Sequence, residues 1–386
     1  MLIPFDDYPY HQIPSTFDHA SDGDRRWTDR YWFVTCSPEG QLALATGLCL
    51  YKNMNVLDCF ASAVIGKKQR NVRMSRALRP KYELIGAGPL RFEVMEGLRS
   101  FRLLLNENEY DLSYDLTWNA KFPPIEEGKG NIFMRSGGVL TQNLVRFFQH
   151  GAITGKITVD GKTFETGDKK WFAFRDRSFG IRPFIGGQNM PSPAPEKKKA
   201  NQSSASAIAI SLFCGFSSED VSGYFRLGQK EDGTCAYFDG RLNYPLGDDR
   251  PEQKQLTMED HKITLSPGIM RLEKFSVSFR SESGEKYRIE GEPLVEPFRY
   301  EGFGYLDGYQ DKQGQGIFRG DDHIEGENYD LTNPEQTIDE SGKCKFKPGI
   351  YLADDVAKLN INGKTGYAEV VVYPASITAK LVKRNT

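Results

Sequence analysis

The sequence predicts an all-β fold made of two antiparallel β-barrel or sandwich domains in tandem. Three observations carry this prediction: long stretches in which polar and apolar residues alternate, Asp-Gly turns between such stretches, and few helical patterns. The cleanest alternation spans residues 110–122. It predicts that Tyr114 and Trp118 face the interior of a barrel, while Asp115 and Asn119 face outward.

Tight turns join many of the expected strands along the chain. Residues 41–51 alternate leucines with small residues, a pattern that suits a barrel because the inner face of a curved sheet needs room. Residues 90–105 form an expected hairpin, and Asp160-Gly161 is the turn of a second hairpin over 153–165. The best helix candidates are two short segments, 140–149 and 352–358.

The predicted domains are residues 1–169 and 170–386, divided where the second hairpin ends and an arginine-rich strand begins. Residues 186–206 interrupt the strand pattern, since they are rich in Pro, Lys and Ser and poor in bulky apolar residues. Such a composition is typical of a flexible loop. The loop is either an inert insertion or a lid over a site. The lid is considered because the loop closely follows the arginine-rich strand.

Composition and charge exclude several classes of protein. With 50 basic and 52 acidic residues the formal net charge is −2, so no overall field recruits nucleic acid. No window approaches the roughly 18 apolar residues of a membrane-spanning helix, and the first residues lack the pattern of a signal peptide. The six cysteines are widely spaced and predict buried thiols in a reducing compartment. We therefore expect a cytoplasmic protein that neither inserts into a membrane nor binds nucleic acid.

The sequence also lacks the common cofactor motifs. It contains neither a Gly-x-Gly-x-x-Gly pattern nor a phosphate-binding loop, so no nucleotide cofactor is expected. Its five histidines form no pair at metal-ligand spacing, and the acidic cluster at 321–327 is expected to be a solvated loop rather than a metal site. Edge strands of open barrels can pair between copies, which leaves a homo-oligomer open.

The segment 171–182 combines four aromatic residues, three arginines and one aspartate. As a strand, it places Arg175, Arg177 and Phe179 on one face and Phe174 and Asp176 on the other. Burial beside aromatic rings raises the pKa of a carboxyl and flanking guanidinium groups lower it, a balance by which proteins tune a general acid. Alternatively, the aspartate forms a structural ion pair with an arginine.

The same segment carries a family resemblance. Arg175-Asp-Arg-Ser-Phe-Gly180, with Arg182, resembles the Arg-Asp-x-Ser-Trp-Gly-x-Arg stretch of a lipocalin-like family, with Phe179 in place of the tryptophan. That family groups carotenoid 1,2-hydratase (hydroxyneurosporene synthase) with attachment-protein-like relatives, and fungal kievitone hydratase and decalin-forming Diels-Alderases are more distant kin. The segments 155–161, 88–94 and 114–118 also look like the family's.

The resemblance implies two lipocalin-like β domains with an apolar pocket at or near their junction. It also implies chemistry on hydrophobic isoprenoid or polyketide skeletons, with an aspartate at the position of Asp176 that protonates an alkene. We therefore expect an enzyme without cofactor that hydrates, dehydrates, isomerises or cyclises a small hydrophobic isoprenoid, terpenoid or polyketide-like substrate.

The expected catalytic residues are Asp176, with Arg175, Arg177 or Arg182 to orient it, and His150, which is either a structural residue or a proton shuttle. The expected substrate-binding residues are Trp171, Phe174, Phe179, Arg182, Tyr114 and Trp118. The alternative function is a carrier that binds a lipid or terpenoid without chemistry, in which Asp176 is a structural partner of an arginine.

Overall fold

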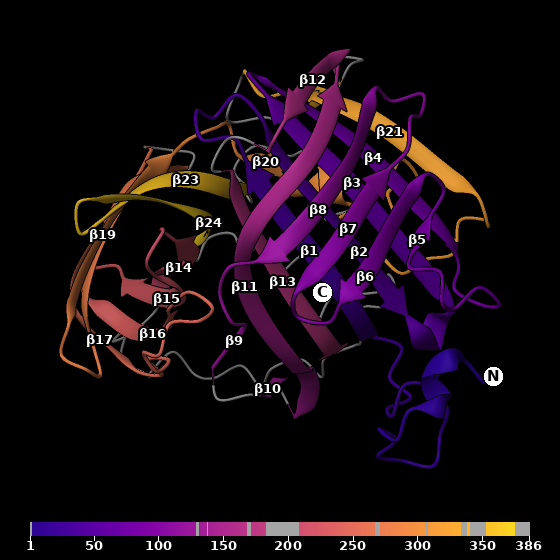
Figure 1. Ribbon diagram of the computed structural model, residues 1–386, viewed down its shortest axis with the longest axis horizontal. Helices are drawn as coiled ribbons and strands as arrows, with labels where there is room; N and C mark the ends of the chain where they lie inside the picture. Colours follow the sequence, from indigo (N-terminus) through magenta and orange to yellow (C-terminus); the bar gives the residue numbers. More distant parts are fainter. Residues whose placement is uncertain are drawn as a thin grey trace, which may run out of the picture.

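The structure is a computed structural model that describes residues 2–128, 131–136, 138–167, 171–182, 208–266, 271–305, 308–332, 338–339 and 353–374. Over these residues the chain forms strands and three short 3-10 turns, η1 (Pro4–Asp7), η2 (Lys52–Met54) and η3 (Tyr300–Phe303), and no α-helix. The predicted all-β class is confirmed. The strands form a half-barrel sheet and a nearly closed barrel sheet, which lie beside each other in Figure 1.

The first sheet contains 15 strands within the described ranges. Its main path is β22 (Ile338–Asp339), β21 (His323–Asp330), β4 (Lys68–Ala77), β3 (Val56–Ile65), β2 (Ala43–Tyr51), β1 (Trp27–Cys36), β13 (Phe172–Ile181), β11 (Val139–Val159), β8 (Leu112–Ala120), β7 (Ser100–Leu105), β6 (Leu90–Glu96) and β5 (Gly86–Ala87). Three short strands pair with β11: β9 (Ile125–Glu126), β10 (Ile132–Ser136) and β12 (Lys162–Glu165).

The second sheet contains nine strands over the same ranges. Its path is β16 (Cys235–Asn243), β15 (Ser222–Lys230), β14 (Ile208–Ser217), β24 (Lys364–Pro374), β23 (Ala353–Ile361), β19 (Lys286–Pro293), β18 (Leu272–Ser281) and β17 (Leu256–Leu265), and β20 (Phe298–Arg299) pairs with β23.

Strand β11 is the corner of the first sheet. Its first half pairs with β13 through Asn143–His150, and its second half pairs with β8 through Gly151–Val159. A Cβ atom at Gly155 would lie 2.0 Å from the carbonyl oxygen of Asp115, and Gly155 has a φ of +130°. Only glycine fits this conformation and this close approach, so Gly155 permits the close pairing of β11 with β8.

The helix expectations at 140–149 and 352–358 are wrong, because 140–149 lies in β11 and residues 353–358 begin β23. Both strands carry buried residues on two faces. A strand covered on both sides lacks the strict alternation of a half-exposed strand, and its apolar residues are easily read as a helix.

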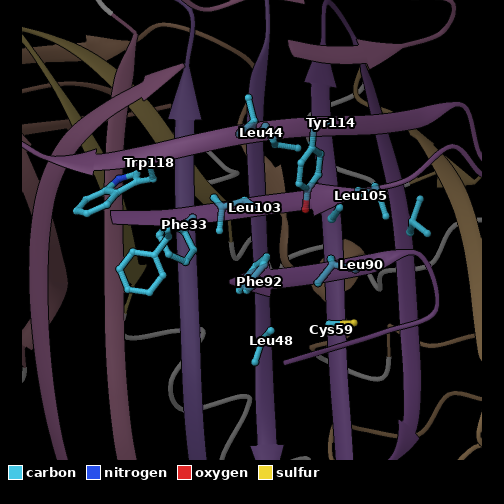
Figure 2. Packing of buried hydrophobic residues seen from close by; sticks show 14 of the residues in the cluster. Phe33, Leu44, Leu48, Cys59, Leu90, Phe92, Leu103, Leu105, Tyr114 and Trp118 are labelled. Carbon is cyan, nitrogen blue, oxygen red and sulfur yellow. The ribbon is translucent and has the colours of Figure 1, made fainter. Parts of the chain in front are cut away.

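Crossing strands fill the interior of the first sheet with side chains. The ring of Phe33 lies 5.4 Å from that of Phe92, 5.5 Å from that of Phe101 and 6.1 Å from that of Trp118, measured between centroids. Figure 2 shows the strands that carry Trp118 and Leu103 running across the strand that carries Phe33. The interior is therefore a packed core.

The pattern at 110–122 and the hairpins are confirmed. Tyr114 and Trp118 are buried in this core, while Asp115 and Asn119 are exposed on the other face of β8. The hairpin of β6 with β7 and that of β11 with β12 pair as expected, and Asp160 and Gly161 take the positive φ values of 50° and 70° that such a turn requires.

The chain crosses between the sheets more than once. Strand β13 pairs with β1 and β11, and β21 pairs with β4, so both belong to the first sheet. In Figure 1 the orange β21 lies along the indigo and purple strands of the amino-terminal half. The predicted division between residues 169 and 170 would assign both strands to the second domain; that division stays a prediction, and the predicted loop at 186–206 lies outside the described residues.

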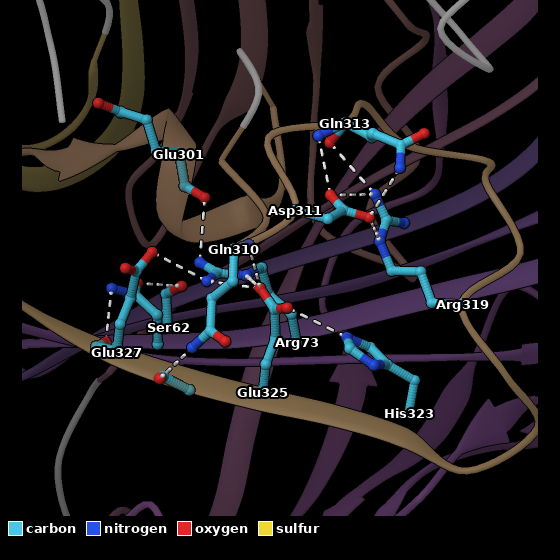
Figure 3. Close-up of polar contacts among 12 residues, drawn as sticks. Ser62, Arg73, Glu301, Gln310, Asp311, Gln313, Arg319, His323, Glu325 and Glu327 are labelled. Carbon is cyan, nitrogen blue, oxygen red and sulfur yellow. Dashed lines mark hydrogen bonds and ion pairs between the residues drawn. The ribbon is translucent and has the colours of Figure 1, made fainter.

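A buried polar cluster around Arg73 of β4 holds β21 and η3 against the first sheet. We call it the Arg73 cluster (Arg73, Glu301, Glu325 and Glu327). The Nε of Arg73 donates to Glu325 at 2.9 Å and its Nη2 donates to Glu327 at 2.9 Å. Its Nη1 donates to the main-chain carbonyl of Glu301 in η3 at 3.2 Å. Figure 3 shows these side chains together, so one arginine of β4 binds both β21 and η3.

Four cysteines, Cys36, Cys49, Cys59 and Cys214, are buried free thiols, as predicted. Cys235 is half-buried, and Cys344 lies outside the described residues. Among the described residues, no helix is long and apolar enough to cross a membrane.

Candidate functional site

Strand β13 separates the predicted site residues onto its two faces. Asp176 pairs directly across from Trp32 of β1 and Phe148 of β11. All three side chains point away from the core of the first sheet, whereas Arg175 points into it. The alternation predicted for 171–182 therefore holds.

The face that carries Asp176 is the junction between the two sheets. Phe148 of the first sheet lies 4.9 Å from the ring of Phe213 on β14 and 5.2 Å from the ring of Tyr224 on β15. Val356 of β23 and Val371 of β24 belong to the same buried cluster. The aspartate that the sequence singles out thus lies where the two sheets meet.

Two arginines hold one oxygen of Asp176. Arg30 Nη1 donates to Asp176 Oδ2 at 3.1 Å, and Arg146 Nε lies 3.7 Å from the same oxygen. The guanidinium of Arg30 also stacks 4.5 Å from the ring centre of Trp32. The other oxygen, Oδ1, is buried and has no hydrogen-bond partner among the described residues. One oxygen is therefore held by two guanidinium groups, and the other has an unused capacity to accept a hydrogen bond.

A pair of buried carboxyl groups from the second sheet lies beside this ion pair. Trp32 Nε1 donates to Glu369 Oε1 on β24 at 2.8 Å, and the carboxyl of Glu369 hydrogen-bonds that of Asp354 on β23. Burial raises the pKa of both groups, and the charge of Asp176 raises that of Glu369 further. A hydrogen bond between two carboxyl groups requires a proton. The pair therefore keeps this proton at a pH at which an exposed carboxyl would have lost its own.

Tyrosine side chains add neutral hydrogen-bond donors to the junction. Tyr300 of η3 hydrogen-bonds Tyr373 of β24, and burial raises the pKa of both phenols. The ring of Tyr305 lies 5.6 Å from that of Tyr300. The phenols of Tyr300 and Tyr373 therefore keep their protons at neutral pH and can donate to a bound oxygen.

The cluster is reached by solvent although it lies deep in the molecule. The side chains of Arg30, Arg146 and Asp176 keep 12, 13 and 13% of their surface exposed. A cavity of about 20 Å³, lined by Arg30, Arg182 and Tyr305 among others, adjoins it. Such a volume holds about one water molecule. We call the set Arg30, Arg146, Asp176, Arg182, Asp354 and Glu369 the junction site.

Arg175 and Arg177 lie away from the junction site. Arg175 donates to Gln149 at 2.9 Å and is surrounded by three aromatic rings in the core, where burial lowers its pKa to about 10. Arg177 pairs with Asp29 at 2.5 Å and stacks on Tyr31. The side chains that contact Asp176 are Arg30 and Arg146, which come from other strands.

The expected substrate-binding residues lie in different parts of the structure. Phe174 and Arg182 lie on the junction face of β13. Trp171, Tyr114 and Trp118 belong to the core of the first sheet, where the Tyr114 hydroxyl hydrogen-bonds Thr46 at 2.7 Å. Phe179 is exposed on the opposite face of β13, against Arg177.

His150 lies on the junction face but away from Asp176. It pairs across from Phe174, and its ring lies 5.0 Å from that of Phe174 and 6.1 Å from that of Phe172. Burial lowers its pKa to about 3. The imidazole is therefore neutral at ordinary pH, in aromatic surroundings.

Sequence reasoning missed Arg30, Arg146, Asp354 and Glu369. The signal for the last two is an acidic residue inside a strongly apolar strand, as in Ala368-Glu-Val370 and Ala353-Asp-Asp-Val356. Buried charged residues of this kind are rare unless they are paired. Within the described part of the chain, no group of three or more His, Cys, Asp or Glu residues is placed to hold a metal ion.

The carboxyl pair predicts how stability depends on pH. A group whose pKa is raised by folding stabilises the protein below its unfolded pKa, and this contribution is lost as pH rises through the folded pKa. Glu369→Gln removes one such group, whose ordinary pKa is 4.5. We expect the fall in Tm between about pH 5 and about pH 8 to be smaller in this variant than in the wild type.

Part of the fall remains in the variant, because burial also raises the pKa of Asp355 to about 7 and that of Asp58 to about 6. Glu290→Gln on the exposed face of β19 is the matched control and leaves the fall unchanged. Equal pH profiles for Glu369→Gln and the wild type would contradict the raised pKa.

Structure comparison finds proteins that overlay on most of this chain at low sequence identity. A protein named AttH from Nitrosomonas europaea has a TM-score of 0.47 and 10% identity, over 95% of this chain and 98% of that chain. Kievitone hydratase from Nectria haematococca gives 0.46 and 11%, over 89 and 88%. CghA gives 0.44 and 10%, over 92 and 89%. Because these values are low, the proposals below rest on the geometry of the site.

A search of curated proteins by sequence finds no match. A family model, described as Family of unknown function (DUF8625), matches residues 2–345. Since this match covers most of the 386 residues, the chain belongs to that family.

Proposed function

We propose that this protein is an enzyme that moves a proton to and from a small hydrophobic molecule at the junction of its two sheets, without a cofactor. The observation that carries the proposal is the pairing of two unlike carboxyl sites. Asp176 meets two guanidinium groups, whereas Glu369 and Asp354 meet each other. Carboxyl groups held in such different environments can supply an acid and a partner carboxylate in one site.

The geometry suggests a role for each group. The carboxyl pair holds the proton that is donated to an alkene or another weakly basic carbon. Asp176 supplies the carboxylate that faces the developing positive charge or accepts a proton, and the aromatic faces of Trp32 and Phe148 flank it. The tyrosine pair orients a substrate oxygen or a water.

The same groups serve hydration, dehydration, isomerisation and acid-assisted cyclisation. The first two differ only in direction, and the third delivers and removes the proton at different carbons. A cyclisation needs mainly the shape of the site and one or two hydrogen-bond donors. The proposed substrate is therefore an isoprenoid, terpenoid or polyketide-like molecule with an unsaturated carbon skeleton.

The packed interior of the first sheet leaves no room there for the enclosed ligand of a barrel carrier. A carrier of the barrel type encloses its ligand in an apolar cavity, commonly of about 300–1,000 Å³. The interior of the first sheet is instead filled by buried side chains that include Phe33, Phe101 and Trp118. The polar groups that solvent reaches lie instead at the junction between the two sheets.

The test is a screen for proton transfer. The protein is incubated in heavy water with a panel of terpenoids, prenylated phenols and polyketides, and the products are analysed by mass spectrometry. We expect one class of compound to gain deuterium, or to gain or lose one water, at a rate that depends on the protein. The proposal would be overturned if compounds of the panel raised the Tm, and so bound, but none showed exchange or conversion. The protein would then be a carrier.

A further inference from the structure

Arginines outnumber their carboxylate partners at the junction. Glu127 accepts from Arg146 at 3.0 Å and also from Arg226. Asp176 binds Arg30 and lies near Arg146 again. Glu369 and Asp354, the other two carboxyls of the junction site, share a proton. Three arginines, Arg30, Arg146 and Arg226, thus share two carboxylates.

Arg182 has no carboxylate partner among the described residues. Its main-chain N–H donates to the carbonyl of Arg26 at 3.2 Å, which fixes the end of β13. Among the described residues, its guanidinium forms neither an ion pair nor a hydrogen bond. Burial and the nearby charges of Arg30 and Arg146 lower its pKa, while the charge of Asp176 raises it, so a bound anion would stabilise the charged guanidinium.

The position of Arg182 defines one end of the junction site. It shares a cavity wall with Arg30 and Tyr305. Arg30 pairs across from Ser178, which lies between Asp176 and Arg182 on the same face of β13. Going along this face, the carboxyl groups come first, Arg30 stands in the middle and Arg182 is at the far end.

One carboxyl group, Asp58, also lines this cavity. Its Oδ2 accepts a hydrogen bond from the main-chain N–H of Gly316 at 2.6 Å. Burial raises the pKa of Asp58 to about 6, while the charges of Arg319 and His323 lower it. Asp58 is thus engaged by the chain segment that covers the cavity.

We infer that Arg182, with Arg30 beside it, binds an acidic group of the substrate at the end of the site opposite the carboxyl pair. This inference rests on the proposed function and names its substrate class: a hydrophobic molecule with a carboxylate or another oxyanion remote from the reacting carbon. A guanidinium suits this task because its planar donors match a carboxylate in pairs.

Two fluorescent probes of nearly equal shape test the inference by binding alone. Anilinonaphthalene sulfonate carries an anion, and N-phenylnaphthylamine is its neutral counterpart. We expect the wild-type protein to bind the sulfonate at least about tenfold more tightly than the neutral probe, as one charge-assisted contact provides. Arg182→Gln removes most of this preference, whereas Arg182→Lys keeps part of it.

The matched control is Arg102→Gln, which removes the same charge from an exposed arginine of β7 and keeps the full preference. Equal affinity of the wild type for both probes, or an unchanged preference in Arg182→Gln, would overturn the inference. Failure of the proposed function appears elsewhere, as the absence of turnover in the heavy-water screen. A protein that prefers the anion through Arg182 but converts nothing would keep the anion site and lose the enzyme.

Discussion

Asp176→Asn is expected to lower turnover by about 10²–10⁴-fold, the usual contribution of a group that handles the proton. Asparagine keeps the size of the side chain and one oxygen. It cannot pair as an anion with Arg30 and Arg146, and it cannot accept the proton. The measurement is kcat on the compound identified by the heavy-water screen, with Tm determined in parallel.

Asp115→Asn is the matched control, because Asp115 forms an exposed ion pair with Arg102 at 2.8 Å and lies on another strand. This control keeps the activity of the wild type. A fully active Asp176→Asn protein would remove the residue from the mechanism. If its activity were kept and its stability fell by about 3–5 kcal/mol, the aspartate would be half of a structural ion pair.

Arg73→Met is expected to destabilise the fold by about 3–5 kcal/mol, because it removes the guanidinium to which two buried or nearly buried carboxylates bind. Methionine fills much of the arginine volume, so the cost comes mainly from the charge left without its partner in Glu325. Urea denaturation monitored by tryptophan fluorescence measures the loss.

The comparison for this variant is Arg102→Met, which breaks an exposed pair and costs about 0.2–1 kcal/mol. A loss as small as this for Arg73→Met would show that the Arg73 cluster contributes little to stability. It would also show that other contacts, such as the hydrogen bonds of Gln69 with the main chain of Arg299, hold η3 on the first sheet.

Features of short range could be predicted from the sequence. The period of two at 110–122 and the Asp160-Gly161 turn depend on neighbours along the chain, and the structure confirms both. The same period placed Asp176 and Arg175 on opposite faces of β13. What a strand presents on each face is a local property, which its own residues determine.

The partners of Asp176 are long-range, and for that reason the sequence did not reveal them. Arg30 lies 146 residues from Asp176, and Trp32 lies 337 residues from Glu369. The cluster at 321–327 was expected to be a solvated loop, yet Glu325 is buried against Arg73, 252 residues away. Which strands become neighbours depends on topology, and periodicity along one segment carries no information about it.

The pairing of β21 with β4 has a consequence for synthesis on the ribosome. Arg73 and Glu325 are 252 residues apart, so at about 5–20 residues per second the hydrogen-bonding edge of β4 waits roughly ten to fifty seconds for its neighbour. An uncovered strand edge is a template for pairing with another nascent chain. We expect newly made protein to depend on chaperones during this interval, and truncation before residue 323 to yield aggregates even though most of the first sheet has already been made.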